Sequence, residues 1–217
     1  MSGLLDRLIK GGKKSENDDW IITFADLMTL LFGFFVLLTT LSTAPKNCAG
    51  LVNYFEENRA FFKNFELRNS KLECVITLPS DFLFRSGEDQ LQPAALRRLG
   101  PLFKTINQLE EHKGDLIIVE GHTDNVPIRT RRFPSNWELS SARATNVAAK
   151  LREEGKMGER LSVRAFAALR PRVPYEDDFG KPLRSRPLQN ARRKNRRVEI
   201  ILINPPKKLE EYGVLFK

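Results

Sequence analysis

An apolar run close to the N-terminus limits the architecture of this chain more than any other feature. From Trp20 to Leu41 the sequence has 22 residues with a single charge, Asp26. A helix of that length reaches about 33 Å, which is enough to cross the hydrocarbon core of a bilayer. Charged residues make up 29% of the chain, which excludes a protein with many spans. The sequence therefore predicts one transmembrane helix over residues 20–42.

The charges before this run predict its orientation. The first 14 residues are basic, with Arg7, Lys10, Lys13 and Lys14 against Asp6. Cytoplasmic flanks of membrane helices carry an excess of Lys and Arg. We therefore expect residues 1–19 to form a cytoplasmic tail, and the chain beyond residue 43 to lie in the periplasm of a Gram-negative cell as part of an inner-membrane protein. The alternative is a cleaved signal peptide, but the apolar run is too long for one and "LSTAPKNCAG" is a poor cleavage site.

Asp26 is an unusual residue for a membrane span. An acidic side chain there costs roughly 2.5–3.5 kcal/mol on insertion scales, and such residues mark ion paths. At 100° per residue, Gly33 and Thr40 lie within about 40° of Asp26 on the helix, and Thr23 and Thr29 flank it. Small and polar residues favour close helix packing in membranes. We expect Asp26 to face protein at a place that an ion can reach; an aspartate that only extends to water at the helix start is the alternative.

The span also resembles a known family. The segment "WIITFADLMTLLFGFFVLL" is similar to the single span of flagellar stator B subunits, the MotB/PomB family. The resemblance implies that Asp26 is the ion-carrying carboxylate. It also implies that two B chains lie inside a ring of five multi-span A subunits, which turns as ions pass. No cofactor is implied besides the transported ion, and the sequence leaves both H⁺ and Na⁺ open.

Residues 43–70 connect the span to the rest of the chain. Apolar side chains recur there at broken helical spacing, namely Leu51, Tyr54, Phe55, Phe62 and Phe65. This pattern predicts an amphipathic helix. The family resemblance implies a plug that blocks ion flow before the motor assembles. A connector helix that packs on the following domain is an equally open alternative.

Two cysteines, Cys48 and Cys74, are too few for a disulfide scaffold. We expect Cys48 to be a free thiol. Pairing of Cys48 with its own copy in a dimer is the alternative, because the compartment outside the inner membrane is oxidising.

The pattern from residue 71 onward predicts a folded α+β domain over residues 71–206, followed by a tail at 207–217. Alternating and β-branched segments predict strands at 71–79, 114–124, 160–166 and 196–203. Helical periodicity predicts helices at 93–112, with a possible kink at Gly100-Pro101, and at 135–155, with Ser135 and Glu138 as a capping box. The order βαβαβ with one further strand favours helices on one face of a mixed sheet.

One constellation in this domain predicts a binding site. Asp124 leaves the end of a strand, and Arg143 lies on the next helix, with Asn136 seven residues earlier on the same stripe. Arginine binds a carboxylate through two parallel hydrogen bonds, and aspartate accepts from an ammonium, so the pair can hold a zwitterion. The alternative is that Asp124 and Arg143 form a salt bridge with each other.

A second resemblance covers residues 80–204. The motifs "EGHTDNVPI", "PSNWELSSARATNV" and "NARRKNRRVEI" are similar to those of the OmpA-like peptidoglycan-binding domain. That family binds the diaminopimelate of the wall peptide, and the resemblance implies that Asp124 and Arg143 do so here. Further motif positions are Thr123, Asn136, Leu139 and Arg197, of which Arg197 is expected to fix the rim of the site.

Composition limits the remaining function classes. The net charge is +9, with cations concentrated at Arg129, Arg131 and Arg132 and over residues 181–197. Such a run is typical of a solvated face, although it could also meet an anionic glycan. No aromatic residues interleave with it, so we expect no nucleic-acid partner. Phosphate-loop and GxSxG motifs are absent, and two histidines without a CxxC motif predict neither an enzyme nor a metal site.

Two alternatives to a flagellar stator subunit remain. A stator-like B subunit of a Zorya-type anti-phage defence motor shares the span and the wall-binding domain. A passive peptidoglycan tether needs only the span with Asp124 and Arg143, and leaves Asp26 without a role.

Overall fold

The computed structural model of the 217-residue chain describes residues 19–41, 48–70, 73–155 and 158–203. The chain divides into two compact units, residues 1–44 and 45–217. The predicted cytoplasmic tail and the predicted C-terminal tail lie outside the described residues, except for Asp19.

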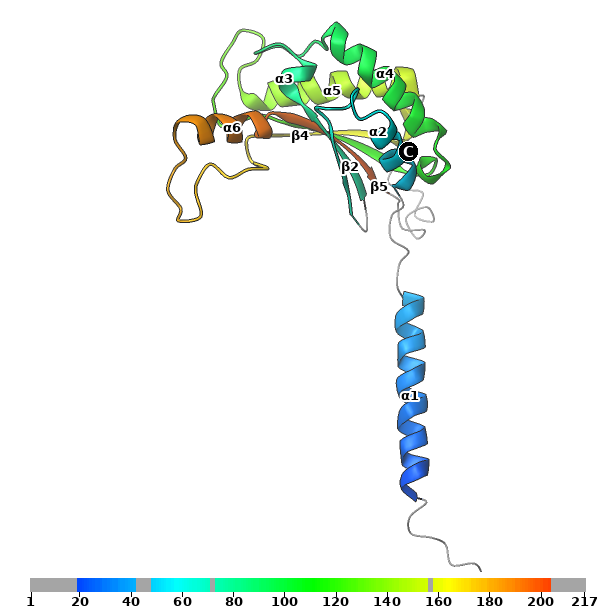
Figure 1. Ribbon diagram of the computed structural model, residues 1–217. Coiled ribbons are helices and arrows are strands. Elements are labelled where there is room, and N and C mark those ends of the chain that lie inside the picture. Colours follow the sequence, from blue (N-terminus) through cyan, green and yellow to red (C-terminus); the bar gives the residue numbers. More distant parts are fainter. Residues whose placement is uncertain (1–18, 42–47, 71–72, 156–157, 204–217) are drawn as a thin grey trace, which may run out of the picture. The chain divides into compact units, whose positions relative to one another are not determined.

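The described part of the first unit is one helix, α1 (Asp19–Leu41; Figure 1). Residues Trp20–Thr39 are long and apolar enough to cross a membrane, which agrees with the predicted span. The hydroxyl groups of Thr23 and Thr29 donate to the backbone carbonyls of Trp20 and Asp26, at 2.9 and 2.8 Å. Both threonines therefore satisfy their hydroxyl donors within the helix, as is common for threonine in apolar surroundings.

The second unit is built on a five-stranded sheet of order β1-β2-β5-β3-β4. The strands are β1 (Glu66–Asn69), β2 (Glu73–Pro79), β3 (Leu116–His122), β4 (Leu161–Ala167) and β5 (Arg197–Ile203). The β3–β4 pair is parallel and the other three pairs are antiparallel, so the predicted mixed sheet is confirmed. All four predicted strands are present, and β1 was not predicted.

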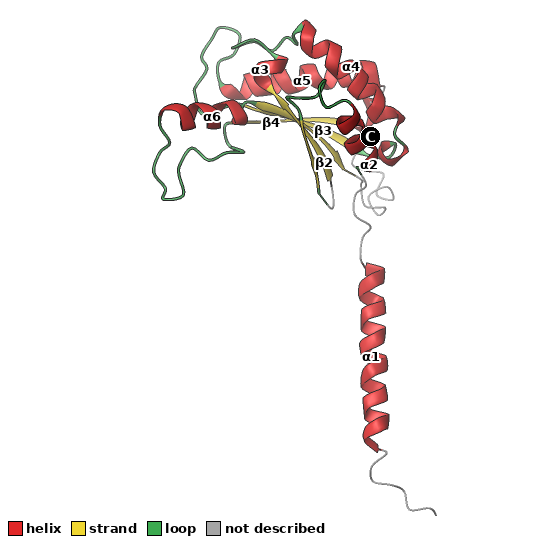
Figure 2. Ribbon diagram, in the orientation of Figure 1, coloured by secondary structure: helices red, strands yellow, loops and turns green. Residues whose placement is uncertain are grey.

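Helices cover one face of this sheet (Figures 1 and 2). The helices of the unit are α2 (Ala49–Glu57), α3 (Ser80–Leu83), α4 (Pro93–Gln108), α5 (Asn136–Gly155) and α6 (Ser185–Asn195), with short 3₁₀ helices η1 (Glu110–His112) and η2 (Gly158–Arg160). The main core lies between the sheet and α4 and α5, and includes Ile76, Leu102, Val119, Val147 and Ile200. Helix α4 continues through Pro101, so the Gly100-Pro101 pair does not end it.

The predicted connector is part of the domain. The predicted amphipathic helix is confirmed as α2, and the apolar residues Leu51, Phe62 and Phe65 are buried in the main core. Strand β1 pairs with β2 immediately afterwards. The segment is therefore a helix that packs on the domain, as one of the two interpretations held. The compact unit begins at residue 45, before the domain start predicted at residue 71.

The expectation for the cysteines was wrong. Cys48, at the start of α2, and Cys74, in β2, form a disulfide within the chain, and both are fully buried. Cys48 is neither a free thiol nor available for pairing with a second copy. The pairing depends on the packing of the connector on β2, which spacing alone does not reveal. A buried disulfide fits a domain outside the reducing cytoplasm.

Removing this disulfide is expected to destabilise the domain. The bond links residues 26 positions apart, which corresponds to about 3.5 kcal/mol of unfolding free energy by loop-closure entropy. The double variant Cys48→Ala/Cys74→Ala should melt roughly 10 °C below the wild type in calorimetry. Dithiothreitol should lower the melting temperature of the wild type and leave that of the variant unchanged. Equal melting temperatures for the two proteins would contradict the assignment.

Candidate functional site

An open cavity of about 690 Å³ lies at one end of the sheet, beside the end of β3 and the start of α5. Its wall includes five of the residues predicted from sequence, namely Thr123, Asp124, Asn136, Leu139 and Arg143. Asp81, Phe84, Arg85 and Arg196 complete its polar and aromatic lining, together with the loop around Val126. The fold thus brings the main predicted binding residues into one cavity.

Asp124 lies two residues after the end of β3 and is 8% exposed. One carboxylate oxygen, Oδ1, accepts from the backbone N–H of Val126 at 3.1 Å. The other, Oδ2, accepts from Nη1 of Arg196 at 2.8 Å. The hydroxyl of Thr123 donates to the backbone carbonyl of Asp124 at 3.0 Å. The carboxylate is therefore held in a fixed orientation at the cavity wall.

Arg196 is a site residue that the sequence analysis missed. Its Nε and Nη2 bind both carboxylate oxygens of Asp81, at 2.9 and 2.7 Å, while Nη1 binds Asp124. The hydrogen bonds that Arg196 donates to Asp81 and, with a smaller effect, to Asp124 raise its pKa in spite of its partial burial. The predicted alternative of a mutual salt bridge between Asp124 and Arg143 does not form, because Asp124 pairs with Arg196 instead.

Arg143 is 5% exposed and binds backbone carbonyls rather than a carboxylate. Its Nε donates to Glu88 at 2.8 Å and its Nη2 to Arg85 at 3.3 Å, and the guanidinium lies 5.1 Å from the centre of the Phe84 ring. Burial lowers the pKa of Arg143 to about 10, so it remains protonated at neutral pH. In the described part of the chain no carboxylate lies within 4.0 Å of it. The cavity wall therefore contains a cation without a contacting anion.

Asn136 and Leu139 shape the cavity from the first turns of α5. The Asn136 amide donates to the carbonyls of Val126 at 2.9 Å and Asp124 at 3.3 Å, which fixes the loop that leaves β3. Leu139 is 5% exposed and adds an apolar wall. Before the helix, Ser135 accepts from the backbone N–H of Trp137 and donates to Glu138, so the predicted capping pair is in contact.

Arg197 does not line the cavity, contrary to its predicted place at the rim. It is 5% exposed, and its Nε binds Glu199 Oε1 at 2.8 Å. Its Nη1 and Nη2 donate to the carbonyls of Asn195 and Arg170. Because side chains alternate along a strand, Arg197 points to the side of β5 away from the cavity. Its neighbour Arg196 lines the cavity instead.

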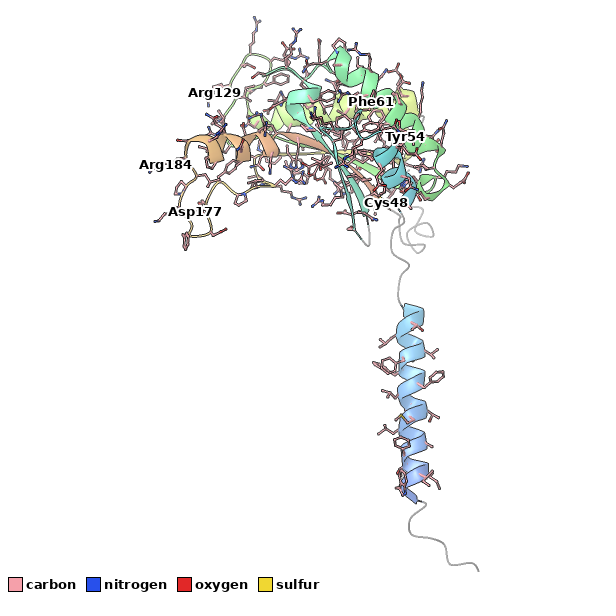
Figure 3. All side chains as sticks on the ribbon, in the orientation of Figure 1. Cys48, Tyr54, Phe61, Arg129, Asp177 and Arg184 are labelled. Carbon is pink, nitrogen blue, oxygen red and sulfur yellow. A yellow bond between two sulfur atoms is a disulfide. The ribbon has the colours of Figure 1, made fainter. Side chains whose placement is uncertain are left out.

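The basic segment over residues 181–197 contains helix α6, which the sequence analysis did not predict. Its side chains are not all solvated, because Asn195 is buried and accepts from the N–H groups of Arg172 and Val173. Arg192 donates to Asn125, next to the cavity loop, at 2.9 Å. Arg129 and Arg184 lie at the end of the domain where α6 is found (Figure 3).

The residues predicted to line an ion path and included in the described helix α1 are Asp26, Thr23, Thr29 and Gly33. A Cβ atom added to Gly33 would meet nothing within 4 Å, so the helix itself does not require glycine there. The side chain of Thr40 lies outside the described residues.

Comparisons with known proteins match both ends of the chain. Residues 9–58 match a family described as "Membrane MotB of proton-channel complex MotA/MotB", and residues 83–183 match the OmpA family. The chain is a MotB-like protein with an OmpA-family domain. The first match contains Asp26, and the second contains Asp124 and Arg143 but not Arg196.

Individual relatives of this MotB-like protein agree with that assignment. Motility protein B of Bacillus subtilis is 31% identical over 73% of this chain, which spans 56% of that protein's length. The uncharacterized protein YtxE of the same organism is 28% identical over 88% of this chain and 91% of its own length. The periplasmic domain of Helicobacter pylori MotB superposes with a TM-score of 0.56 at 26% identity, covering 69% of this chain and 87% of that domain.

The position of Asp124 depends on a close approach at Gly121. A Cβ atom on Gly121 would lie 2.1 Å from the backbone oxygen of Ser140 in α5, which no real contact permits. Glycine therefore lets the start of α5 lie directly on β3, three residues before the Asp124 carboxylate.

Replacing Gly121 is expected to move α5 away from β3. Gly121→Ala should lower the free energy of unfolding by about 3 kcal/mol, because the obstacle is backbone that must shift. Gly114→Ala is the matched control, since a Cβ there meets nothing within 4 Å. Urea unfolding followed by circular dichroism measures both, and equal midpoints would show that the close approach is not a constraint.

Proposed function

We propose that this protein is the wall-anchored, ion-conducting B subunit of a bacterial rotary motor. The observation that supports it most is the carboxylate of Asp26 within a span that matches the MotB family. A carboxylate in lipid costs free energy, so it is retained where an ion or a proton uses it. The cavity in the second unit supplies a separate function, attachment to the cell wall.

The cavity is suited to a ligand with both an ammonium and a carboxylate group. Asp124 is held by two donors but keeps lone pairs for a third, since a carboxylate accepts up to about four hydrogen bonds. Arg143 is a buried cation that contacts no anion among the described residues. A carboxylate group of the ligand could pair with it. The diaminopimelate of peptidoglycan has this combination of groups. Leu139 and Phe84 offer apolar surface for the aliphatic part of such a ligand.

The family assignment supports a proposal for the partners. The protein would act in the inner membrane as a dimer within a ring of five multi-span A subunits, with the domain of residues 45–217 on the periplasmic side. H⁺ or Na⁺ would pass by way of Asp26 and drive rotation of the ring. Flagellar and anti-phage motors share this arrangement, and genes neighbouring this one would distinguish them.

Asp26→Asn tests the ion-conducting role. Asparagine has nearly the same shape but cannot carry a charge or exchange a proton, so ion-driven rotation should fall to zero while membrane insertion and wall binding persist. Motor speed in cells that express the protein with its A subunit is the measurement, with and without sodium at fixed membrane voltage. Thr39→Ser is the control, since the Thr39 hydroxyl only bonds its own helix at the carbonyl of Val36. Normal rotation with Asp26→Asn would leave a passive tether as the function.

Substitutions in the cavity test the wall-binding role. Asp124→Asn and Arg143→Gln should each weaken binding to purified peptidoglycan sacculi by roughly ten- to hundredfold, the loss expected for one hydrogen bond to a charged group. Sedimentation with sacculi measures the bound fraction. Lys104→Gln removes one positive charge at an exposed position on α4 and should bind as the wild type does. If all three variants bind equally well, the cavity is not the wall site.

A further inference from the structure

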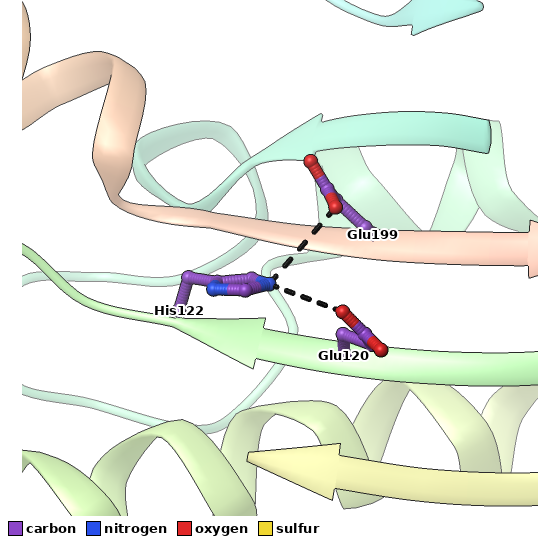
Figure 4. Close-up of side chains that lie close together, drawn as sticks. All are labelled: Glu120, His122 and Glu199. Carbon is purple, nitrogen blue, oxygen red and sulfur yellow. Dashed lines mark ion pairs between the residues drawn. The ribbon is translucent and has the colours of Figure 1, made fainter. Parts of the chain in front are cut away.

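A second cluster of polar side chains lies within the sheet, apart from the cavity. Glu120 and His122 belong to β3, and Glu199 belongs to β5. Glu120 is the register partner of Glu199 across the β3–β5 pair, and residues two apart along a strand share one face. The three side chains therefore converge, as Figure 4 shows. Their exposures are only 5%, 2% and 6%.

His122 has no hydrogen-bond partner within this cluster. Both ring nitrogens are buried, and none of the described residues offers either of them a donor or acceptor in hydrogen-bonding geometry. Nε2 faces the two carboxylates at 3.6 Å from Glu120 Oε2 and 4.0 Å from Glu199 Oε2, longer than a hydrogen bond. A buried polar group without a partner is costly and needs an explanation. The ring also stacks against Phe166, which holds its orientation.

Each of the two carboxylates also contacts an arginine. Arg197 Nε binds Glu199 Oε1 at 2.8 Å, and Arg164 Nη1 lies 3.5 Å from Glu120 Oε1. Each glutamate thus uses Oε1 for an arginine and leaves Oε2 facing His122. Ligands of metal ions are commonly oriented by such outer contacts.

We propose that Glu120 Oε2, His122 Nε2 and Glu199 Oε2 form a binding site for a divalent cation of the zinc class. One imidazole and two carboxylates are a donor set that Zn²⁺ accepts, with a solvent molecule in the fourth position. The three donor atoms lie within 4.8 Å of one another. In a tetrahedral site with bonds of about 2.0–2.1 Å, donor atoms lie roughly 3.4 Å apart, so the observed separations require only a slight closing of the side chains.

The position of the carboxylates agrees with a cation here. Arg164 and Arg197 pair with the Oε1 atoms, and the Oε2 atoms of both glutamates face the same point from adjacent strands. The competing explanation is a protonated His122 that pairs with both carboxylates. No motif in the sequence predicted the site, because its ligands come from two strands and have none of the usual zinc spacings.

A cation at this point would join β3 to β5 where both strands meet the cavity. Thr123 and Asp124 follow His122 directly, and Arg196 precedes β5. The ion would therefore stabilise the sheet end from which the wall-binding residues extend. Zinc binding depends on neither ion flow through α1 nor wall binding, so its failure would leave both of those functions untouched.

The test uses the full chain in detergent, stripped with EDTA and dialysed, with ZnCl₂ as the probe. Isothermal titration and elemental analysis should find one zinc ion per chain, and zinc should raise the melting temperature. Glu120→Gln and Glu199→Gln keep the shape of the side chains and should each weaken zinc binding at least tenfold. His112→Gln is the matched control and should bind zinc as the wild type does. His112 is a buried histidine whose Nδ1 bonds Asp115 at 2.8 Å.

Two results would overturn the proposal. The first is a wild-type chain that takes up no zinc, which would leave the contacts of His122 with the two glutamates as the role of the cluster. The second is zinc binding that is unchanged in both glutamine variants, which would place the ion elsewhere. The wild-type titration decides the first case even if a variant fails to fold.

Discussion

The ion pairs of Arg196 organise the domain around its cavity. One guanidinium joins Asp81, just after β2, to Asp124, just after β3, from its own place before β5. Three chain segments that are distant in sequence therefore meet at one cation. The side chains of Arg196 and Asp81 are 31% and 47% exposed, so water screens this network, and each pair is expected to contribute about 1 kcal/mol or less to stability. The network fixes where the three segments meet at the cavity wall.

The same network explains why Arg143 is available to a ligand. Had Asp124 paired with Arg143, a zwitterion would have to break that salt bridge to bind. Arg196 instead takes the Asp124 carboxylate, and Arg143 is held by the carbonyls of Arg85 and Glu88. Those carbonyls fix its geometry without cancelling its charge. Such a preorganised charged site loses little free energy to rearrangement when an anion binds.

Motifs predicted which residues line the cavity better than they predicted which residues those side chains contact. Asp124, Arg143 and Asn136 are positioned by local features, a strand end and one face of α5, which periodicity reveals. Arg196 and Arg197 are adjacent, and only the register of β5 decides which of them faces the cavity. The disulfide and the burial of Phe62 depend on the connector folding back onto β2, a long-range contact that no local pattern encodes. The amphipathic helix α6 was not predicted within the basic segment near residue 190, because the buried residues of that helix, Ala191 and Asn195, are small or polar.

The disulfide also limits how far the wall-binding domain can extend from the membrane helix. Six residues, 42–47, separate the end of α1 from Cys48, and fully extended they allow roughly 25 Å. If the connector detached from the domain, the chain from Cys48 to Cys74 would add roughly 85 Å in an open form. With the disulfide intact that segment is a closed loop and adds almost nothing. This bond links Cys48 directly to β2, whether or not α2 remains packed. A longer reach would therefore require reduction of a bond that the fold buries completely.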